Sequence, residues 1–326
     1  MALAPILTVD DFLTVYGGEV IKAYNAEALV AKTVRTRTIS SGKSATFPVY
    51  GREEAKLHTP GNDLFGASPD FAMDLTATDE IINIDKLLIA PQFVDDLNDA
   101  MAHYDVRGEM AMQAGASLST AHERWCIAAL GKAAVASSLA TSTTVAIASL
   151  TGAQIATALQ TTASAMDSAF IPRTGRYAVL PPAQFYKLMA LDAVVSSDFG
   201  RGADRNGVGG IGTLWYMGFE ILNSAVMDEF DGRTAAEMVS ATGSAAGGPG
   251  PLYFGGTIQR NSLAFVGTLV YGICYHKDAI GTLQLKGITS EIDWIPERQG
   301  HLLSTKRAIG VDALRPGSAW TLVTTS

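Results

Sequence analysis

The alternation of apolar and polar positions predicts one unusually long helix. Residues Val106 to Ala136 contain no proline, and at 1.5 Å per residue they would span roughly 45 Å. Small or apolar residues recur at the spacing of one buried helical face: Met110, Ala114, Leu118, Ala121, Trp125 and Ala128. The polar side is expected to carry Arg107, Glu109, Gln113, His122, Glu123 and Arg124. Asp105 is the expected N-cap, and a short helix from Asp95 to Tyr104 is predicted before it.

The segment before this helix predicts an arm followed by a β-hairpin with a long excursion. A helical pattern runs from Val9 to Ala31, and we expect Gly17 and Gly18 to interrupt it. Apolar and polar residues then alternate from Thr38 to Arg52, which is typical of a strand. Residues 53–79 are polar and contain prolines, and Glu80 to Ala90 is the expected returning strand. A loop of this length in a compact domain is usually functional or disordered.

The segment after the long helix predicts a mixed α/β portion and then strands. A Ser/Thr-rich link at 137–149 precedes a helix from Gly152 to Ser168 with Thr151 as its cap. The remaining expected elements are a buried strand at Tyr177–Leu180, a helix from Ala183 to Leu191 begun by Pro181–Pro182, a glycine-rich loop at 198–213, one strand at Leu214–Leu222, a loop at 228–256, one or two strands at 262–274, a short helix or turn at 278–283, and strands from 285 to 309 and up to Val323. This order indicates an α+β fold in which the late strands rejoin the early part.

Composition narrows the possible classes of function. Only 17% of the residues are charged, a low share for a free-standing monomer. One interpretation is that much of the surface is buried against other chains; the other is that the sequence is simply rich in alanine and glycine. The net charge of −8 argues against a nonspecific DNA binder with a basic face. Cys126 and Cys274 lie far apart and suit a reducing compartment. The N-terminus lacks the pattern of a secretory signal, and no membrane span is expected.

The short motifs in the chain do not assemble a catalytic, cofactor-binding or metal site. The glycines of Gly207–Gly212 match a dinucleotide signature, but a strand is predicted after them where a helix is required. Gly42-Lys43-Ser44 would need a glycine where Arg37 stands. His122–Glu123 begins a zinc-protease pattern that Cys126 breaks. Asp95, Asp96 and Asp99 are expected to be a solvated helical turn. We therefore expect no enzyme activity and no cofactor.

Two further sets of residues can be explained without a binding or catalytic role. The five histidines lack ligand spacing and are expected to be surface or structural: His58, His103, His122, His276 and His301. A basic set flanks the long excursion and could pair with acidic groups of another chain, or could simply be solvated: Arg35, Arg37, Lys43, Arg52 and Lys56. An arm, a long excursion and a low surface charge are devices for contacting other copies.

Several blocks of sequence resemble one known family. In chain order they are Arg37–Arg52, Pro60–Leu64, Ile82–Ala90, Asp99–Arg107, Tyr216–Leu222, His276–Leu285 and Leu314–Pro316. Together they are similar to the major capsid proteins of short-tailed, podovirus or autographivirus-type phages. The resemblance covers nearly the whole chain except 137–149 and 228–256.

The resemblance implies an α+β fold of the Hong Kong 97 capsid type. It implies an N-terminal arm at 1–47 and an extended hairpin called the E-loop at 48–84. A peripheral domain at 85–150 would contain the long helix as its spine. An axial domain would follow at 151–283, and return strands to the peripheral domain at 284–326.

The resemblance also implies a structural function in the virion. Hexamers and pentamers of the chain would form an icosahedral shell around double-stranded DNA, and an acidic chain suits DNA that must enter and leave. A portal protein and a separate scaffolding protein are expected partners. The main alternative is the shell of an encapsulin-type nanocompartment. Some members of this fold join a lysine to a neighbour's asparagine; the candidates here are Lys43 or Lys56 with Asn206 or Asn261, and we expect no such link.

Overall fold

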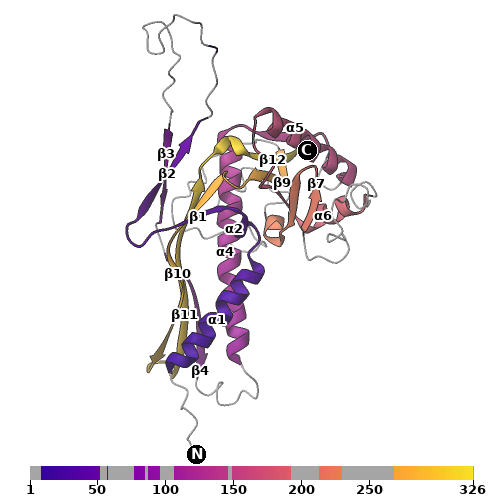
Figure 1. Cartoon of the computed structure of the whole chain (residues 1–326). Coiled ribbons are helices and arrows are strands. Elements are labelled where there is room, and N and C mark those ends of the chain that lie inside the picture. Colours follow the sequence, from indigo (N-terminus) through magenta and orange to yellow (C-terminus); the bar gives the residue numbers. More distant parts are fainter. Residues whose placement is uncertain are drawn as a thin grey trace, which may run out of the picture.

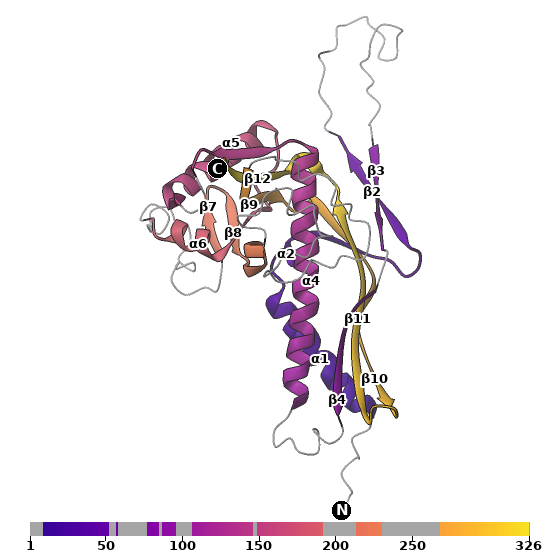
Figure 2. The ribbon, with the colours of Figure 1, turned by 180° about the vertical axis from the view of Figure 1, so that it is seen from behind.

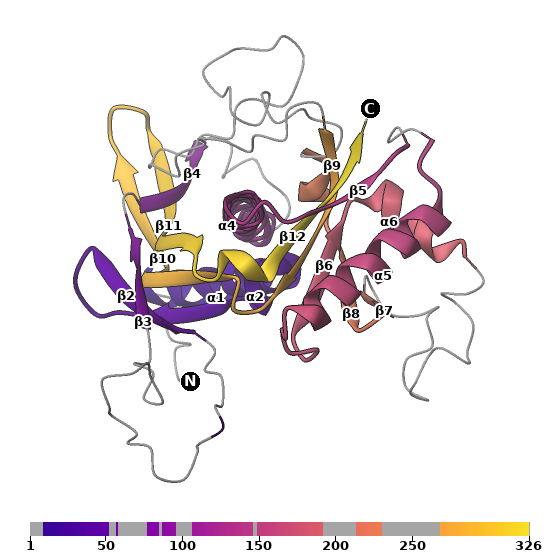
Figure 3. The same cartoon turned by 90° about the horizontal axis from the view of Figure 1, so that it is seen from above.

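The computed structural model describes residues 9–51, 57, 77–84, 87–95, 106–145, 149–191, 213–229 and 268–325. The long helix α4 stands at the centre, a four-stranded sheet runs along one side of it, and a six-stranded sheet with two helices lies on the other side (Figure 1). Seen from above, α4 lies end-on between the two sheets (Figure 3). The helices are α1 (Val9–Glu27), α2 (Val30–Thr33), α4 (Val106–Ala136), α5 (Gly152–Ser168) and α6 (Pro182–Met189), with short 3₁₀ turns η2 (Ala225–Glu229) and η3 (Pro316–Ser318).

Helix α4 has the bounds that the sequence predicts, but its buried face is broader than expected. Ala114 and Leu118 are buried as predicted, whereas Trp125 is only partly buried against the core. His122 and Glu123, which were assigned to the polar side, are buried instead. Elements pack on several sides of α4, so its burial does not follow a single stripe. The predicted helix at 95–104 is wrong at Asp95, which ends a strand; its other residues lie outside the described residues.

Helix α1 is continuous through Gly17 and Gly18, so the predicted interruption is wrong. A glycine in a helix interior costs about 1 kcal/mol relative to alanine, a cost that tertiary packing can offset. Tyr16 and Val20 are buried in a cluster with Ala111 and Ala114 of α4. The break comes later, between Glu27 and Val30, where the chain leaves α1 and enters the short helix α2. Figure 2 shows α1 lying along the lower half of α4.

The four-stranded sheet joins early and late parts of the chain, as the sequence predicts. Its order is β1-β10-β11-β4, and its strands are β1 (Arg35–Thr38), β10 (Ile280–Ile295), β11 (Gly300–Ala313) and β4 (Leu87–Asp95). The antiparallel pair β10–β11 forms its long axis, and β4 pairs with β11 from Leu87 to Asp95. A short helix or turn was predicted at 278–283. Only the first residues of this segment form a turn, because β10 begins at Ile280.

A separate two-stranded ribbon projects beyond the rest of the described chain (Figure 1). It consists of β2 (Ser44–Tyr50) and β3 (Ala77–Asn83), paired antiparallel. The single returning strand predicted from Glu80 to Ala90 is therefore wrong: β3 and β4 are two strands in different sheets. The ribbon is attached through a small cluster in which Phe47 and Ile82 pack against Leu283 and Leu314.

The six-stranded sheet has the order β5-β12-β9-β6-β8-β7. Its strands are β5 (Ala140–Thr143), β12 (Ala319–Thr325), β9 (Thr268–His276), β6 (Arg176–Leu180), β8 (Phe219–Asn223) and β7 (Thr213–Tyr216). The strand predicted at 214–222 is a hairpin, because Met217 and Gly218 have positive φ and form its turn. The C-terminal strand β12 joins this sheet between β5 and β9.

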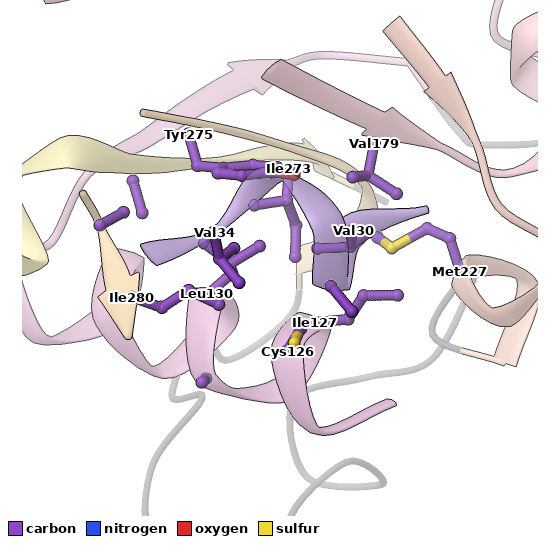
Figure 4. Packing of buried hydrophobic residues seen from close by; sticks show 14 of the residues in the cluster. Val30, Val34, Cys126, Ile127, Leu130, Val179, Met227, Ile273, Tyr275 and Ile280 are labelled. Carbon is purple, nitrogen blue, oxygen red and sulfur yellow. The ribbon is translucent and has the colours of Figure 1, made fainter. Parts of the chain in front are cut away.

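The main core lies between α4, α2 and the inner face of the six-stranded sheet. Figure 4 shows Val30 and Val34 enclosed by Cys126, Ile127 and Leu130 of α4 and by side chains of the sheet. A second core lies on the sheet's other face, beneath α5 and α6. Helix α5 begins as predicted at a capping box, in which Gln154 Oε1 accepts hydrogen bonds from the backbone N–H and the hydroxyl of Thr151 (2.9 and 3.1 Å).

Candidate functional site

A buried polar cluster lies where α1, α4 and the four-stranded sheet meet. The hydroxyl of Tyr24 lies 2.6 Å from Nδ1 of His122, and the guanidinium of Arg307 stands 4.7 Å from the centre of the Tyr24 ring. Arg307 Nη1 lies 3.4 Å from the same His122 nitrogen, and its Nη2 donates to Gln284 Oε1 at 2.9 Å. Buried polar groups of this kind are stabilised by their mutual hydrogen bonds. The cluster therefore ties α1 to the long helix and to β10 and β11.

The neighbours of His122 keep its imidazole neutral. Burial, together with the nearby charge of Arg307, lowers the pKa of His122 to about 3. Both Tyr24 and Arg307 approach Nδ1 as donors, so this nitrogen accepts and the proton resides on Nε2. Burial likewise raises the pKa of Tyr24, and Arg307 opposes that rise. At neutral pH the cluster thus carries the single positive charge of Arg307, over the neutral ring of Tyr24 and beside the neutral imidazole of His122.

Glu123, the next residue on α4, connects three segments through one buried carboxylate. Its Oε1 accepts the backbone N–H groups of Leu29 and Val30 at 2.9 and 2.8 Å, at the start of α2. Its Oε2 lies 3.3 Å from the hydroxyl of Ser224, which precedes η2. Burial raises the pKa of Glu123, and these three hydrogen bonds oppose the rise. The residue fixes the arm and the end of β8 against the long helix.

The arrangement is suited to holding elements together rather than to catalysis. Cys126 is buried in the same region, and burial raises the pKa of its thiol, which disfavours the nucleophilic thiolate. No group of three or more His, Cys, Asp or Glu side chains that could hold a metal occurs in the part of the chain that the structure describes. No helix among those residues is long and apolar enough to cross a membrane.

The projecting ribbon is the second candidate site, because it presents side chains away from the cores. Tyr50 and Ile81 are exposed on it, at 50% and 57%. The ribbon is also held along its length: Arg37 stands over the ring of Phe47 in the middle of β2, and Arg315 Nη2 donates to the carbonyl of Tyr50 at the end of β2, at 2.8 Å. A two-stranded ribbon with exposed apolar side chains is a typical template for contacts with another chain.

The structure describes only some of the residues that the sequence singled out. Lys43 is exposed just before β2, and Arg35 and Arg37 are exposed on β1. His122 and His276 are buried, and His301 stacks edge-on against Trp294. The remaining candidates lie outside the described residues: Arg52, Lys56, His58, Asp96, Asp99, His103, Asn206, Gly207–Gly212 and Asn261.

Sequence reasoning missed the buried cluster because its members look like surface residues. His122 and Glu123 are polar and adjacent, so the helical pattern assigned both to the solvent side. Tyr24 and Arg307 come from distant segments, and no motif links them to α4. The sequence offers no signal that separates His122 and Glu123 from the other ionisable residues of the same helix, such as Arg124.

Comparison with known proteins places these features in one family. A family model described as Gp10A-like, major capsid protein, matches residues 46–323. The major capsid protein of Escherichia phage T7 is 28% identical over 96% of this chain and 91% of its own length. The corresponding protein of Enterobacteria phage T3 is also 28% identical, over 96% of this chain and 91% of its own.

Solved structures agree with the sequence matches. A chain from the capsid structure of the cyanophage P-SCSP1u aligns with a TM-score of 0.65 and 27% identity, covering 91% of this chain and 88% of the other. The mature capsid of bacteriophage PhiM1 aligns with a TM-score of 0.63 at 16% identity, covering 92% and 87%, and this match bears on the fold alone. The α+β fold is that of the Hong Kong 97 capsid type, as the sequence predicts.

Proposed function

This chain belongs to the Gp10A-like family of major capsid proteins, and we propose that its copies form the hexamers and pentamers of an icosahedral phage shell around double-stranded DNA. It is a structural protein of the phage virion. The observation that carries the proposal is the family match over residues 46–323, in agreement with phage capsid proteins that align along 96% of the chain. The exposed ribbon and the low charged share of 17% support repeated contacts between copies.

We propose that the subunit is divided into an arm, an E-loop, a peripheral domain and an axial domain. An arm at 1–47, an E-loop at 48–84 that includes the β2–β3 ribbon, and a peripheral domain at 85–150 with α4 as its spine agree with the element order. The axial domain at 151–283 corresponds to α5, α6 and most of the six-stranded sheet. Because β12 pairs with β9 and β5, we propose that the return segment consists of β11 and most of β10, and that 319–325 belong to the axial domain.

The partners other than copies of the chain stay predictions. They are a scaffolding protein, a portal protein and double-stranded DNA bound without sequence specificity. The net charge of −8 supports weak, nonspecific contact with DNA, because an acidic surface repels the phosphate backbone. The absence of enzyme activity is also a proposal, supported by the structural role of the family.

The encapsulin alternative has less support. A virus-like particle from Pyrococcus furiosus aligns with a TM-score of 0.55, but its identity of 13% concerns the fold alone. The relatives found by sequence are phage capsid proteins, at 28% identity. Shells that contained an enzyme cargo and no DNA when isolated from the host would favour the alternative.

Co-expression with a scaffolding protein of the same phage would test the proposal. We expect closed shells of uniform diameter in negative-stain images and a single large species by light scattering. Stable interfaces of the kind required usually bury more than about 1,000 Å². Only monodisperse monomers under these conditions would contradict the proposed function.

A further inference from the structure

Large exposed apolar side chains gather on the unit built from the six-stranded sheet, α5 and α6. Phe170 and Tyr186 are 71% and 64% exposed, and Trp215 and Met217 are 47% and 44% exposed. Aromatic and methionine side chains are enriched where proteins bind one another, and aromatic side chains frequently act as anchors. The four side chains form two separate groups on opposite sides of the unit, as the sheet geometry shows.

The first group lies on the β7–β8 hairpin, at the edge of the sheet that the described residues form. Leu214 and Tyr216 of β7 pack into the core beneath α5 and α6. Side chains alternate along a strand, so Trp215 faces the other side of the sheet. There it lies opposite Glu220, which lies opposite Tyr177 on β6. Among the described residues β7 pairs only with β8, so Trp215 ends this cross-strand row at the rim.

The hairpin turn presents Met217 in an unusual backbone conformation. Met217 has a φ of 49° and Gly218 a φ of 84°, in a two-residue turn where asparagine is the usual first residue. A methionine in the left-handed region is strained relative to asparagine or glycine, and such strain persists where the surroundings impose it. Stability of the turn alone would favour asparagine or glycine at this position, but the chain has an apolar methionine there.

The second group lies on the helical layer that covers the opposite face of the sheet (Figure 3). Tyr186 is on α6, which contacts the start of α5 where Gly152 lies against the carbonyl of Lys187. Phe170 follows the other end of α5, roughly 25 Å away for a helix of this length. Between them, α5 has a shallow hollow lined by uncharged side chains: Thr157, Gln160, Thr161, Ser164, Ala165 and Ser168.

A buried arginine fixes the turn that displays Phe170. Arg176 is 1% exposed at its side chain; its Nη2 donates to Asp167 Oδ1 at 2.7 Å and also to the carbonyl of Ile171. Its Nε donates to the carbonyl of Pro172 at 3.0 Å. Asp167, the one charged residue of α5, is thereby paired with Arg176 and with Arg173. The hydrogen bonds of buried Arg176 hold the turn after α5 in place, so Phe170 has a fixed position.

We propose that the β7–β8 hairpin of one copy docks on the α5–α6 layer of a second copy of this chain. The inference rests on the proposed function, in which copies contact one another around a capsomer. Two different surfaces on opposite faces of one unit give a head-to-tail contact, and such a contact forms a ring when the rotation between copies closes, as in a capsomer. Few charged side chains lie on the two surfaces: Glu220 on the hairpin, and Lys187 and the Asp167–Arg173 pair on the helical layer. Glu220 and Lys187 have opposite signs, so their charges do not oppose the contact. Trp215 and Met217 are the anchors, and the hollow of α5 between Tyr186 and Phe170 receives them.

Thiol crosslinking of assembled shells tests this contact. Both natural cysteines, Cys126 and Cys274, are buried, so introduced cysteines would be the accessible thiols. Shells of the double variant Trp215→Cys/Thr161→Cys, treated with a short bifunctional maleimide, should give a ladder of dimers, trimers and higher species on a denaturing gel. Shells assembled from a mixture of the two single variants should give dimers only, because each chain then carries one half of the contact.

The matched control is Trp294→Cys/Thr161→Cys, since Trp294 is 43% exposed but lies at the far end of β10. It should give no ladder. If shells of the double variant, or shells assembled from the mixture, gave no crosslinked species, the proposed contact would be overturned and the shell function would be unaffected. Dimers from Trp215→Cys alone would also overturn it, because they would indicate a symmetric contact. Failure of the unaltered chain to form shells would instead contradict the proposed function.

Discussion

At the scale of single residues, the buried histidine of α4 makes the stability of the subunit depend on pH. The folded pKa of His122, about 3, lies below its ordinary value of 6.5, so the unfolded chain binds a proton first as the pH falls. This contribution to stability is therefore complete above about pH 6.5 and is lost toward pH 3, by at most about 1.4 kcal/mol per pH unit. His122→Gln should flatten the pH dependence of the unfolding free energy of unassembled subunits between pH 7 and 5. Parallel curves for the two proteins would contradict the assignment.

The carboxylate of Glu123 is expected to contribute more to stability than any exposed charge of the same helix. Glu123→Ala would leave the N–H groups of Leu29 and Val30 buried without their acceptor, at a cost of about 2–4 kcal/mol. Denaturant unfolding of subunits measures this change. Glu109→Ala, at an exposed position near the start of α4, is the matched control and should change stability by less than about 0.5 kcal/mol. Equal effects of the two substitutions would show that Glu123 does not hold the arm.

Trp125 was expected to be a core residue, and its partial burial lowers the expected effect of removing it. A fully buried tryptophan truncated to alanine costs about 3–5 kcal/mol. Trp125 packs against the main core from its rim, so Trp125→Ala should cost about 1–3 kcal/mol in a thermal melt of the subunit. A melting temperature identical to that of the unaltered chain would mean that the indole contributes no packing.

At the scale of elements, glycines in two helices should respond to alanine in opposite directions. A Cβ at Gly17 or Gly18 of α1 would meet no atom within 4 Å, so each alanine should stabilise the subunit by about 0.5–1 kcal/mol. A Cβ at Gly115 of α4 would lie 2.6 Å from the carbonyl oxygen of Val20 and 2.7 Å from Cβ of Ala23. Gly115→Ala should therefore push α1 away from α4 and lower the melting temperature. A stabilising Gly115→Ala would contradict the close crossing of these helices.

The same elements show which parts of the fold could be predicted from sequence. Helix α4 and the capped helix α5 were predicted with their bounds, because each has a periodic pattern and a local start signal. The continuity of α1 was missed because the packing that offsets Gly17 and Gly18 comes from residues about a hundred positions away. The β7–β8 hairpin was missed because its turn uses Met217 where turn residues are normally polar. Long-range packing and unusual turn residues leave no signal in a local pattern.

The candidate sites were less predictable than the fold. The family resemblance predicted the shell function and identified the long excursion as the E-loop. Both predictions were possible because blocks of sequence match the family in the same order. The cluster of Tyr24, His122 and Arg307 depends on three distant segments meeting, and no spacing rule connects them. A polar residue on a helix is normally predicted to be exposed, and its burial can be inferred only when its hydrogen-bond partners are known.

At the scale of the whole molecule, the subunit places two sheets beside one central helix and a ribbon beyond them, and leaves apolar side chains exposed on all three. Ile81 is exposed on the ribbon, Ile89 on the four-stranded sheet and Trp215 on the six-stranded sheet. Scattered apolar residues are normal on a monomer, but large ones on every projecting part indicate several contacts per copy. The shell is therefore expected to be held by many noncovalent interfaces acting together.

That expectation extends to the mature particle, which we predict to contain no covalent links between subunits. A lysine that attacks an asparagine side chain needs a desolvated, partly neutral amine. Lys43 is exposed in the subunit, beside the exposed Gly42 and Ser44. Lys56 follows Glu53 and Glu54 in sequence, and carboxylates close to an ammonium favour its charged form. Boiled mature particles should therefore run on a denaturing gel as one band near the chain mass of 34.3 kDa. A ladder of hexamer-sized and larger bands, lost on replacement of Lys43 or Lys56 by arginine, would contradict this prediction and identify the reactive lysine.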